Sequence, residues 1–292
     1  MNHLITACVL CLALGLHPAA GAAAPGAKAT PANGWSAQSA EVVGQVRAGE
    51  PLVVHVVVPL CHNGQVACGA HGLGDPASPR TNLYWGALYG AKRFFDRAGS
   101  GWEAVPQTGP PEGVLARAVY RRHVAGARWG RTASQPVEQL VVLDAIHGEA
   151  INQAVVQFYR NATEGRRLTL DDGGSTRQLA ISVAGYAGHN RLMDGIRLPA
   201  ARAGAGPGAV PSFVLACFSE RYFGTSLRAH GSDTLVMTQA FMAPEGYVVE
   251  ATARALGDNR SHAEVRAAAV RAYAKWQRLS AVAAGQLFAP TD

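Results

Sequence analysis

From residue 50 onward the chain alternates between short, densely apolar runs and longer segments in which apolar residues recur every three or four positions. The run "PLVVHVVVPLC" at 51–61 is β-branched and lacks polar alternation, which is typical of a strand buried on both faces. The segment 82–99 has helical spacing and ends at Gly99. Strands are predicted over 51–61, 114–126, 137–148, 177–190, 211–218 and 234–242, and helices over 82–99, 149–165, 219–232, 244–257 and 262–284.

This order of elements predicts the fold class. Strands that alternate with helices indicate an α/β fold, with a mainly parallel sheet flanked by helices. No linker-like break follows residue 50, so residues 49–285 are predicted to form a single domain. A chain of 292 residues is long enough to bury a sizeable core within one such domain.

The N-terminal segment has a different pattern. The apolar run "LITACVLCLALGL" spans only 13 residues and leads into small residues with A-x-A-like cleavage sites, so residues 1–25 are predicted to be a secretory signal peptide. A retained anchor is the alternative. Residues 26–48 are rich in Ala, Gly, Ser and Pro and are predicted to be a flexible lead-in. The mature protein is therefore expected to be periplasmic or secreted, with no stable membrane insertion once the signal is removed.

Charge adds little to this picture. The formal net charge is +6, and the basic residues are spread thinly rather than gathered in runs. Nucleic-acid-binding proteins cluster their cations on one face or along one helix. A nucleic-acid partner is therefore not predicted.

Three cysteines follow the predicted signal peptide: Cys61, Cys68 and Cys217. Cys61 and Cys68 lie in one loop, and in an exported protein we expect them to form a disulfide, leaving Cys217 as a free thiol. The same loop contains His62 and His71, so a zinc site is an alternative, although this spacing is not an established one. A thiol-redox or metal-storage role for the loop is a third, weaker hypothesis, and no metal or cofactor is predicted.

Two of the predicted strands end on residues that can perform acid–base or nucleophilic chemistry. The run 177–190 reaches His189 at its end, and the run 211–218 reaches Cys217. About 20 residues separate the two runs, which is enough for a right-handed crossover between neighbouring parallel strands. Because parallel strands place their carboxyl ends at one edge of the sheet, an imidazole and a thiol are predicted to meet there. A nearby imidazole raises the thiolate fraction of a cysteine.

A histidine that ends one strand and a cysteine that ends the next are also the arrangement of the caspase-like fold of caspases, legumains, gingipains and separases. This sequence resembles that family at "AGYAGHN" and "VLACFS". The resemblance implies a caspase-like three-layer sandwich and a cysteine peptidase, with His189 as the base and Cys217 as the nucleophile. Gly188 matches a glycine often seen near the family's histidine, and the amides around Gly188 and Cys217 would form an oxyanion hole beside Asn190.

The expected partner is a peptide or protein substrate. Asp144, Asp194 and Glu245 are each candidates for an acidic wall that receives a basic side chain, and His147 ends a strand at the same edge, where it either shapes the cleft or begins the next helix. The alternative function is a catalytically inactive caspase-like module that binds a peptide or glycan in the periplasm. Asn190 favours this alternative, because the family commonly has glycine directly after the histidine.

Overall fold

The strand β1 (Leu52–Pro59) lies in the middle of a seven-stranded sheet, and each of its residues is buried. The computed structural model describes residues 37–70, 72–132, 134–200 and 208–291, so the predicted signal peptide and the start of the lead-in lie outside the described residues. The strand order is β2-β3-β4-β1-β7-β8-β9. The other strands of this sheet are β2 (Glu103–Val105), β3 (Ala116–Val124), β4 (Val137–Ile146), β7 (Val183–Ala187), β8 (Ser212–Leu215) and β9 (Thr234–Val236).

The sheet is mainly parallel, as predicted. β4, β1, β7, β8 and β9 pair in parallel, whereas at one edge β3 pairs antiparallel with β4 and β2 pairs antiparallel with β3. The chain leaves β1 to form β4 on one side and later returns to form β7 on the other side. The carboxyl end of β1 is therefore a topological switch point, the place where open α/β sheets bind their ligands.

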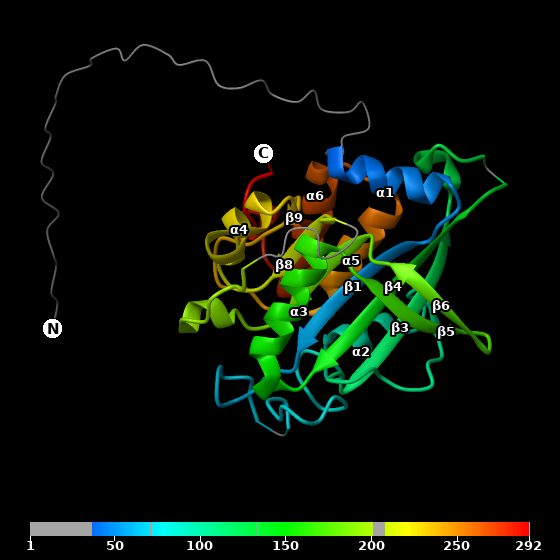
Figure 1. Ribbon diagram of the computed structural model, residues 1–292. Coiled ribbons are helices and arrows are strands. Elements are labelled where there is room, and N and C mark those ends of the chain that lie inside the picture. The colour runs from blue at the N-terminus through cyan, green and yellow to red at the C-terminus, as the bar shows by residue number, and fades with distance from the viewer. Residues whose placement is uncertain (1–36, 71, 133, 201–207, 292) are drawn as a thin grey trace, which may run out of the picture.

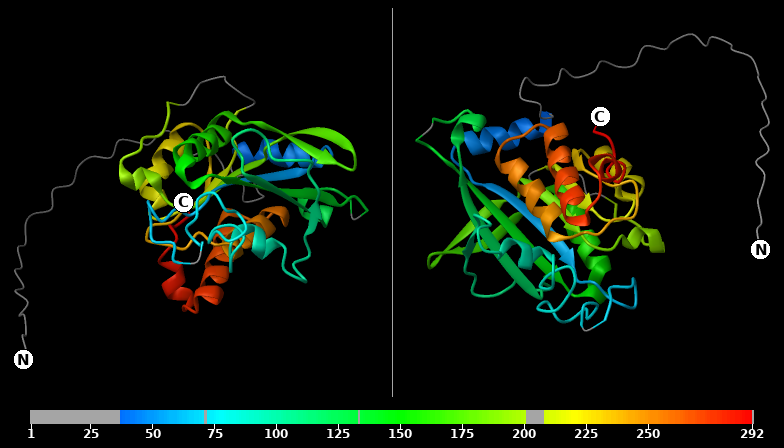
Figure 2. Two further views of the ribbon diagram at one scale, coloured as in Figure 1. Left: turned by 90° about the horizontal axis from the view of Figure 1, so that it is seen from below. Right: turned by 180° about the vertical axis from the view of Figure 1, so that it is seen from behind.

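Helices cover both faces of the sheet (Figures 1 and 2). On one face, α3 (Ile151–Glu164) and α4 (Thr225–Ala229) pack against residues of β1, β7 and β8. The other face packs against α1 (Ala37–Arg47), α2 (Ala91–Phe95), α5 (Gly246–Gly257), α6 (His262–Gln277) and α7 (Ala281–Gly285). The prediction of a single α/β domain built as a three-layer sandwich is confirmed. Among the described residues, no helix is long and apolar enough to cross a membrane.

The predicted helix 82–99 forms only over α2. Asn82 is fully buried, and its side chain bonds to both main-chain groups of Cys61 and accepts from the amide of Tyr84, at 2.8–3.1 Å. A Cβ atom at Gly86 would lie 2.4 Å from the carbonyl oxygen of Arg80, and Leu88 has a left-handed φ of 42°. The side-chain hydrogen bonds of Asn82 thus hold residues 82–90 in successive turns despite the helical spacing of their apolar residues.

The predicted strand 177–190 is two strands. β6 (Ser175–Ala180) pairs with β5 (Arg167–Asp172) in a separate antiparallel hairpin, whose turn contains Gly173 and Gly174, both with positive φ. The chain then enters the main sheet as β7. At the junction, the hydroxyl oxygen of Ser182 accepts from the amide of Val53 at 3.0 Å, which fixes the start of β7 beside β1.

Two helical predictions also differ from the structure. The segment 262–284 is divided into α6 and α7, because Arg278 adopts a left-handed φ of 55° and the Ser280 hydroxyl caps a new helix. Within the predicted lead-in 26–48, residues Ala37–Arg47 form α1. Its Val42, Val43 and Val46 recur at helical spacing and are buried in the main core, so this part of the lead-in is packed on the domain.

Candidate active site

His189 lies at the carboxyl edge of the sheet, two residues beyond the end of β7. Its main-chain carbonyl accepts a hydrogen bond from the buried Tyr186 hydroxyl at 2.7 Å. Its imidazole Nε2 lies 2.7 Å from Oδ2 of Asp194, which also accepts from Arg191 at 2.8 Å. Since an ionised carboxylate can only accept, Nε2 carries a proton and Nδ1 is the basic nitrogen of the neutral ring.

The carboxylate beside His189 is held in its charged form. Partial burial by itself raises the pKa of Asp194, but the hydrogen bonds from Arg191 and His189 outweigh burial and lower this pKa below its ordinary value. A negative charge in this position fixes the orientation of the imidazole and stabilises its protonated form.

Cys217 lies two residues beyond β8, and its thiol is free. The next residue, Phe218, has a left-handed φ of 51°, a conformation that costs a non-glycine residue on the order of 1 kcal/mol and is enriched at functional sites. The turn is secured by Ser219, whose hydroxyl donates to the Val214 carbonyl and accepts from the Thr238 amide, both at 2.8 Å. A π-helical turn, Glu220–Gly224, then leads into α4 in place of the single helix predicted over 219–232.

The register of the sheet gives His189 and Cys217 equivalent places beyond two adjacent strands. The last paired residues of β7 and β8 are Ala187 and Leu215, and each candidate lies two positions further along its own chain. Neighbouring strands lie about 4.8 Å apart, and residues two apart share a face. Ala187 and Leu215 both face the core layer under α5 and α6, and each chain leaves the sheet two residues before its candidate residue.

Asn190 joins the two chain segments directly. Its side chain is fully buried, and its Nδ2 donates to the carbonyl of Cys217 at 2.6 Å. Its Oδ1 accepts from the amide of Leu192 at 3.1 Å and so caps the short turn that carries Asp194. One amide side chain therefore fixes the Cys217 main chain relative to the His189 loop.

The thiol of Cys217 contacts the main chain of Met242. Sγ of Cys217 lies 3.5 Å from the amide nitrogen and 3.6 Å from the carbonyl oxygen of Met242. Burial raises the pKa of Tyr84 and of Tyr273. Coulombic interactions with Cys217 and Glu245 raise both pKa values further, whereas the hydrogen bond to the amide of Ala243 lowers that of Tyr273. This electrostatic link between the two tyrosines and Cys217 was not foreseen from the sequence.

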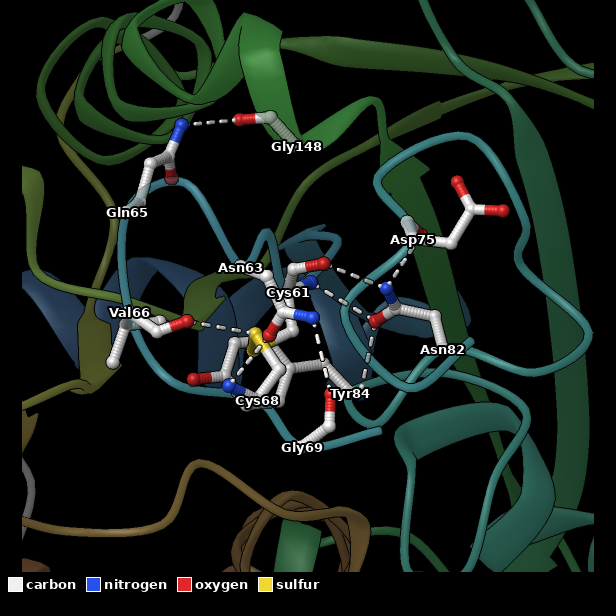
Figure 3. The surroundings of a disulfide bond; sticks show 10 residues. All are labelled: Cys61, Asn63, Gln65, Val66, Cys68, Gly69, Asp75, Asn82, Tyr84 and Gly148. Atoms are coloured by element: carbon white, nitrogen blue, oxygen red, sulfur yellow. Dashed lines mark hydrogen bonds between the residues drawn. A yellow bond between two sulfur atoms is a disulfide. The ribbon is translucent and has the colours of Figure 1, made fainter. Parts of the chain in front are cut away.

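Tyr84 is held in place by the disulfide loop. Cys61 and Cys68 are bonded, with their Cα atoms 6.0 Å apart, which confirms the predicted pair and leaves no thiolate there to bind zinc. Figure 3 shows Asn82 beside this bond, hydrogen-bonded to the main chain of Cys61, Asp75 and Tyr84. The loop therefore connects the carboxyl end of β1 to Tyr84, one of the two tyrosines that interact electrostatically with Cys217. His71, also named for the zinc alternative, lies outside the described residues.

Gly188 has a packing role in this structure. A Cβ atom there would lie 2.7 Å from Cγ of Pro59 at the end of β1, so the close approach of β7 to β1 requires glycine. The amide of Gly188 donates to the carbonyl of Leu215 at 3.2 Å. That hydrogen bond engages the amide of Gly188 in the sheet, and the oxyanion role around Gly188 and Cys217 stays a prediction.

The remaining candidates lie apart from one another. His147 follows β4, and its Nδ1 accepts from the amide of Glu149 at 3.2 Å, so it caps the turn before α3. Asp144 is fully buried within β4 and pairs with Arg117 and His55. Two strands, β1 and β7, lie between β4 and β8 in the sheet. Of the three predicted acidic residues, Glu245 is the one that acts on the same two tyrosines as Cys217.

No protein-family model, curated protein or solved structure matches this chain.

Proposed function

We propose that this protein is a cysteine hydrolase of the caspase-like type that cleaves peptide bonds, with Cys217 as the nucleophile and His189 as the base. The observation that carries this proposal is the register: the two residues occupy matching positions beyond the ends of two adjacent parallel strands. The support comes from this geometry together with the resemblance of "AGYAGHN" and "VLACFS" to that family.

The proposed reaction has two stages. Sγ of Cys217 attacks the carbonyl carbon of the peptide bond, the thiol proton passes to His189, and the C–N bond breaks as His189 protonates the leaving amine. Water then attacks the thioester and gives its proton to His189, and breaking of the C–S bond releases the carboxylic acid. Proton return to sulfur regenerates the thiol. No oxidant or metal is needed for either stage.

Two neighbouring residues have positioning roles in this proposal. Asp194 orients the imidazole through Nε2 and stabilises its charge after it accepts a proton. Asn190 holds the carbonyl of Cys217 while it caps the turn of Asp194, so the distance between base and nucleophile is set by a buried side chain.

The experiment is labelling of the full chain by peptides that carry a thiol-directed electrophile, with the modified residue identified by mass spectrometry of fragments. We expect the label on Cys217 and none on the disulfide-bonded Cys61 and Cys68. Replacement of Cys217 by alanine should abolish it, and His189→Ala should slow it about tenfold or more, because a nearby base supplies the thiolate. The matched control is His147→Ala, which removes a histidine that caps a turn after β4.

Two outcomes would defeat the proposal: labelling that persists in Cys217→Ala, or equal rates in His189→Ala and the wild-type protein. The second candidate function is the non-catalytic binding module. It is favoured by the contacts of the thiol, which lie on the Met242 main chain, whereas the described partner of the imidazole is Asp194. Reversible peptide binding without label on Cys217 would identify this alternative.

A further inference from the structure

A second candidate site lies on the opposite face of the sheet from the Cys217 thiol. A cavity of about 710 Å³ opens between α3, the strands β3 and β4, and the β5–β6 hairpin. This volume is within the range of cavities that hold small molecules. Residues of α3 at 152–153, 156–157 and 160–161 form one wall, because these positions recur on one side of the helix.

The floor of the cavity is a buried charged network. Nε2 of His55 lies 2.8 Å from Oδ2 of Asp144, and both side chains are fully buried. Arg117 donates to the two carboxylate oxygens of Asp144 at 2.7 Å each, and its side chain is only 6% exposed. On its other side, the His55 ring accepts from Asn161 at 2.9 Å. A network of this kind is costly to bury, and here its histidine and arginine line an open cavity.

The rim of the cavity carries positive charge. Arg160 comes from α3 and Arg167 from the first position of β5, on two different walls. No ion pair to either residue is found in the part of the chain that the structure describes, and Nη2 of Arg167 donates to the carbonyl of Gln178 at 2.8 Å. Arg166 lies 3.6 Å from Glu164, and Glu112 is the acidic residue among those lining the cavity.

The other residues that line the cavity indicate the chemical type of ligand that would fit between Arg160 and Arg167. Val114, Ile146, Val156 and Leu168 contribute apolar surface, whereas Asn152, Gln153 and Gln157 contribute side-chain amides. Arginine pairs with carboxylate and phosphate through two parallel hydrogen bonds, which uncharged donors do not match. The cavity therefore suits an anionic group attached to an apolar body.

We propose that this cavity is a binding site for a small organic anion that carries a carboxylate or phosphate group on an apolar scaffold. Arg160 and Arg167 contact the anion, and the apolar wall contacts the scaffold. Arg117 is a positioning residue, because its Nε and Nη2 both donate to the carboxylate of Asp144. The proposal does not depend on the hydrolase function, because the cavity and the thiol lie against different core layers.

The test is calorimetric titration of the full chain with three probes that share one ring system: 2-naphthyl phosphate, 2-naphthoate and uncharged 2-naphthol. We expect at least one anion to bind about tenfold more tightly than 2-naphthol, and the better of the two anions identifies the preferred charged group. Arg160→Gln and Arg167→Gln should each weaken that anion about tenfold. Arg271→Gln, an exposed position on α6, is the matched control and should bind as the wild type does.

The proposal is overturned if 2-naphthol binds as tightly as both anions, or if both cavity variants bind as Arg271→Gln does. A measurement on the wild-type protein avoids any effect of substitution on folding. Modification of arginines by phenylglyoxal should be slowed by the tighter anion at Arg160 and Arg167 but not at Arg271, and equal rates at all three would overturn the site. Cys217→Ala should bind the anion normally, so failure of the hydrolase proposal leaves this result unchanged.

Discussion

The protein contains two histidine–aspartate pairs whose surroundings differ sharply. His55 and Asp144 lie inside the sheet, with both side chains 0% exposed, whereas His189 and Asp194 lie at its edge, with 14% and 34% exposure. Nε2 of each imidazole is about 2.7–2.8 Å from its carboxylate. The two pairs have nearly the same Nε2–carboxylate distance, so any difference in their chemical roles must come from the groups around them.

The difference concerns the second nitrogen of the ring. In His55, Nδ1 is engaged by Asn161, and the Asp144 carboxylate is engaged by Arg117. Every polar group there has a protein partner, which is how a buried polar network stabilises one arrangement. His189 pairs with Asp194 through Nε2 and retains Nδ1 as its basic nitrogen. A histidine–aspartate pair whose polar atoms are all hydrogen-bonded stabilises the fold. A pair at a strand end whose histidine keeps a basic nitrogen is suited to proton transfer.

The strongest test of this comparison is removal of the two carboxylates. Asp144→Ala should lower the free energy of unfolding by about 3–5 kcal/mol, because it leaves the buried Arg117 without its partner. Asp194→Ala should lower it by about 1 kcal/mol or less, because that pair is partly exposed. Urea unfolding of both variants measures the difference, and equal losses would show that the two pairs are energetically alike.

Acid provides a second test. Burial by itself raises the pKa of Asp144, but the hydrogen bond from Arg117 and the proximity of His55 outweigh burial and lower this pKa to about 2, from an ordinary value of 3.8. The stability contributed by the charged carboxylate is therefore fully present above about pH 4 and is lost as the pH falls through about 2. The loss should be on the order of 2 kcal/mol.

The variant Asp144→Asn isolates this component, because its side chain does not titrate. Unfolding free energies measured from pH 5 to pH 2 should fall less steeply in the variant than in the wild type. Parallel curves would show that Asp144 has the same pKa in the folded and unfolded chains.

The smallest expected effect concerns the exposed pair. Asp194→Asn should slow alkylation of Cys217 by iodoacetamide at neutral pH a few-fold, because an amide stabilises the protonated imidazole less well than a carboxylate. The free energy of unfolding should change little. Asp172→Asn, which removes another ion-paired carboxylate on β5, is the control and should react at the wild-type rate. An unchanged rate in Asp194→Asn would remove Asp194 from the proposed site.

Local pattern was enough to predict the sheet and its direction. The runs that became β1, β4 and β8 are continuous and apolar, and such runs form strands wherever helices cover both faces. The same pattern concealed the network beneath the cavity, since His55 and Asp144 each interrupt a valine-rich run by a single polar residue. Their pairing depends on the lateral register of β1, β4 and β3, which no local segment specifies.

The candidate site also combines features that local sequence predicts with features that depend on distant residues. The placement of His189 and Cys217 just beyond strand ends was predictable, because each lies at the end of an apolar run. Tyr84 was not, because its helix-like spacing resembled core packing and its position depends on Asn82, which bonds to residues 21 positions earlier in the chain. The hairpin of β5 and β6 was missed because Ile181 and Val183 continue the apolar pattern across the change of sheet.

The position of Asn82 links oxidation of the protein to the conformation of one loop. The amide side chain of Asn82 bonds to the main chain of both Cys61 and Tyr84, so the bond between Cys61 and Cys68 restrains the loop that follows β1. In a chain with both sulfurs reduced, this loop loses its covalent restraint while the sheet beneath it keeps its own hydrogen bonds. Oxidation of two cysteines thus adds a covalent restraint to the segment that carries Tyr84.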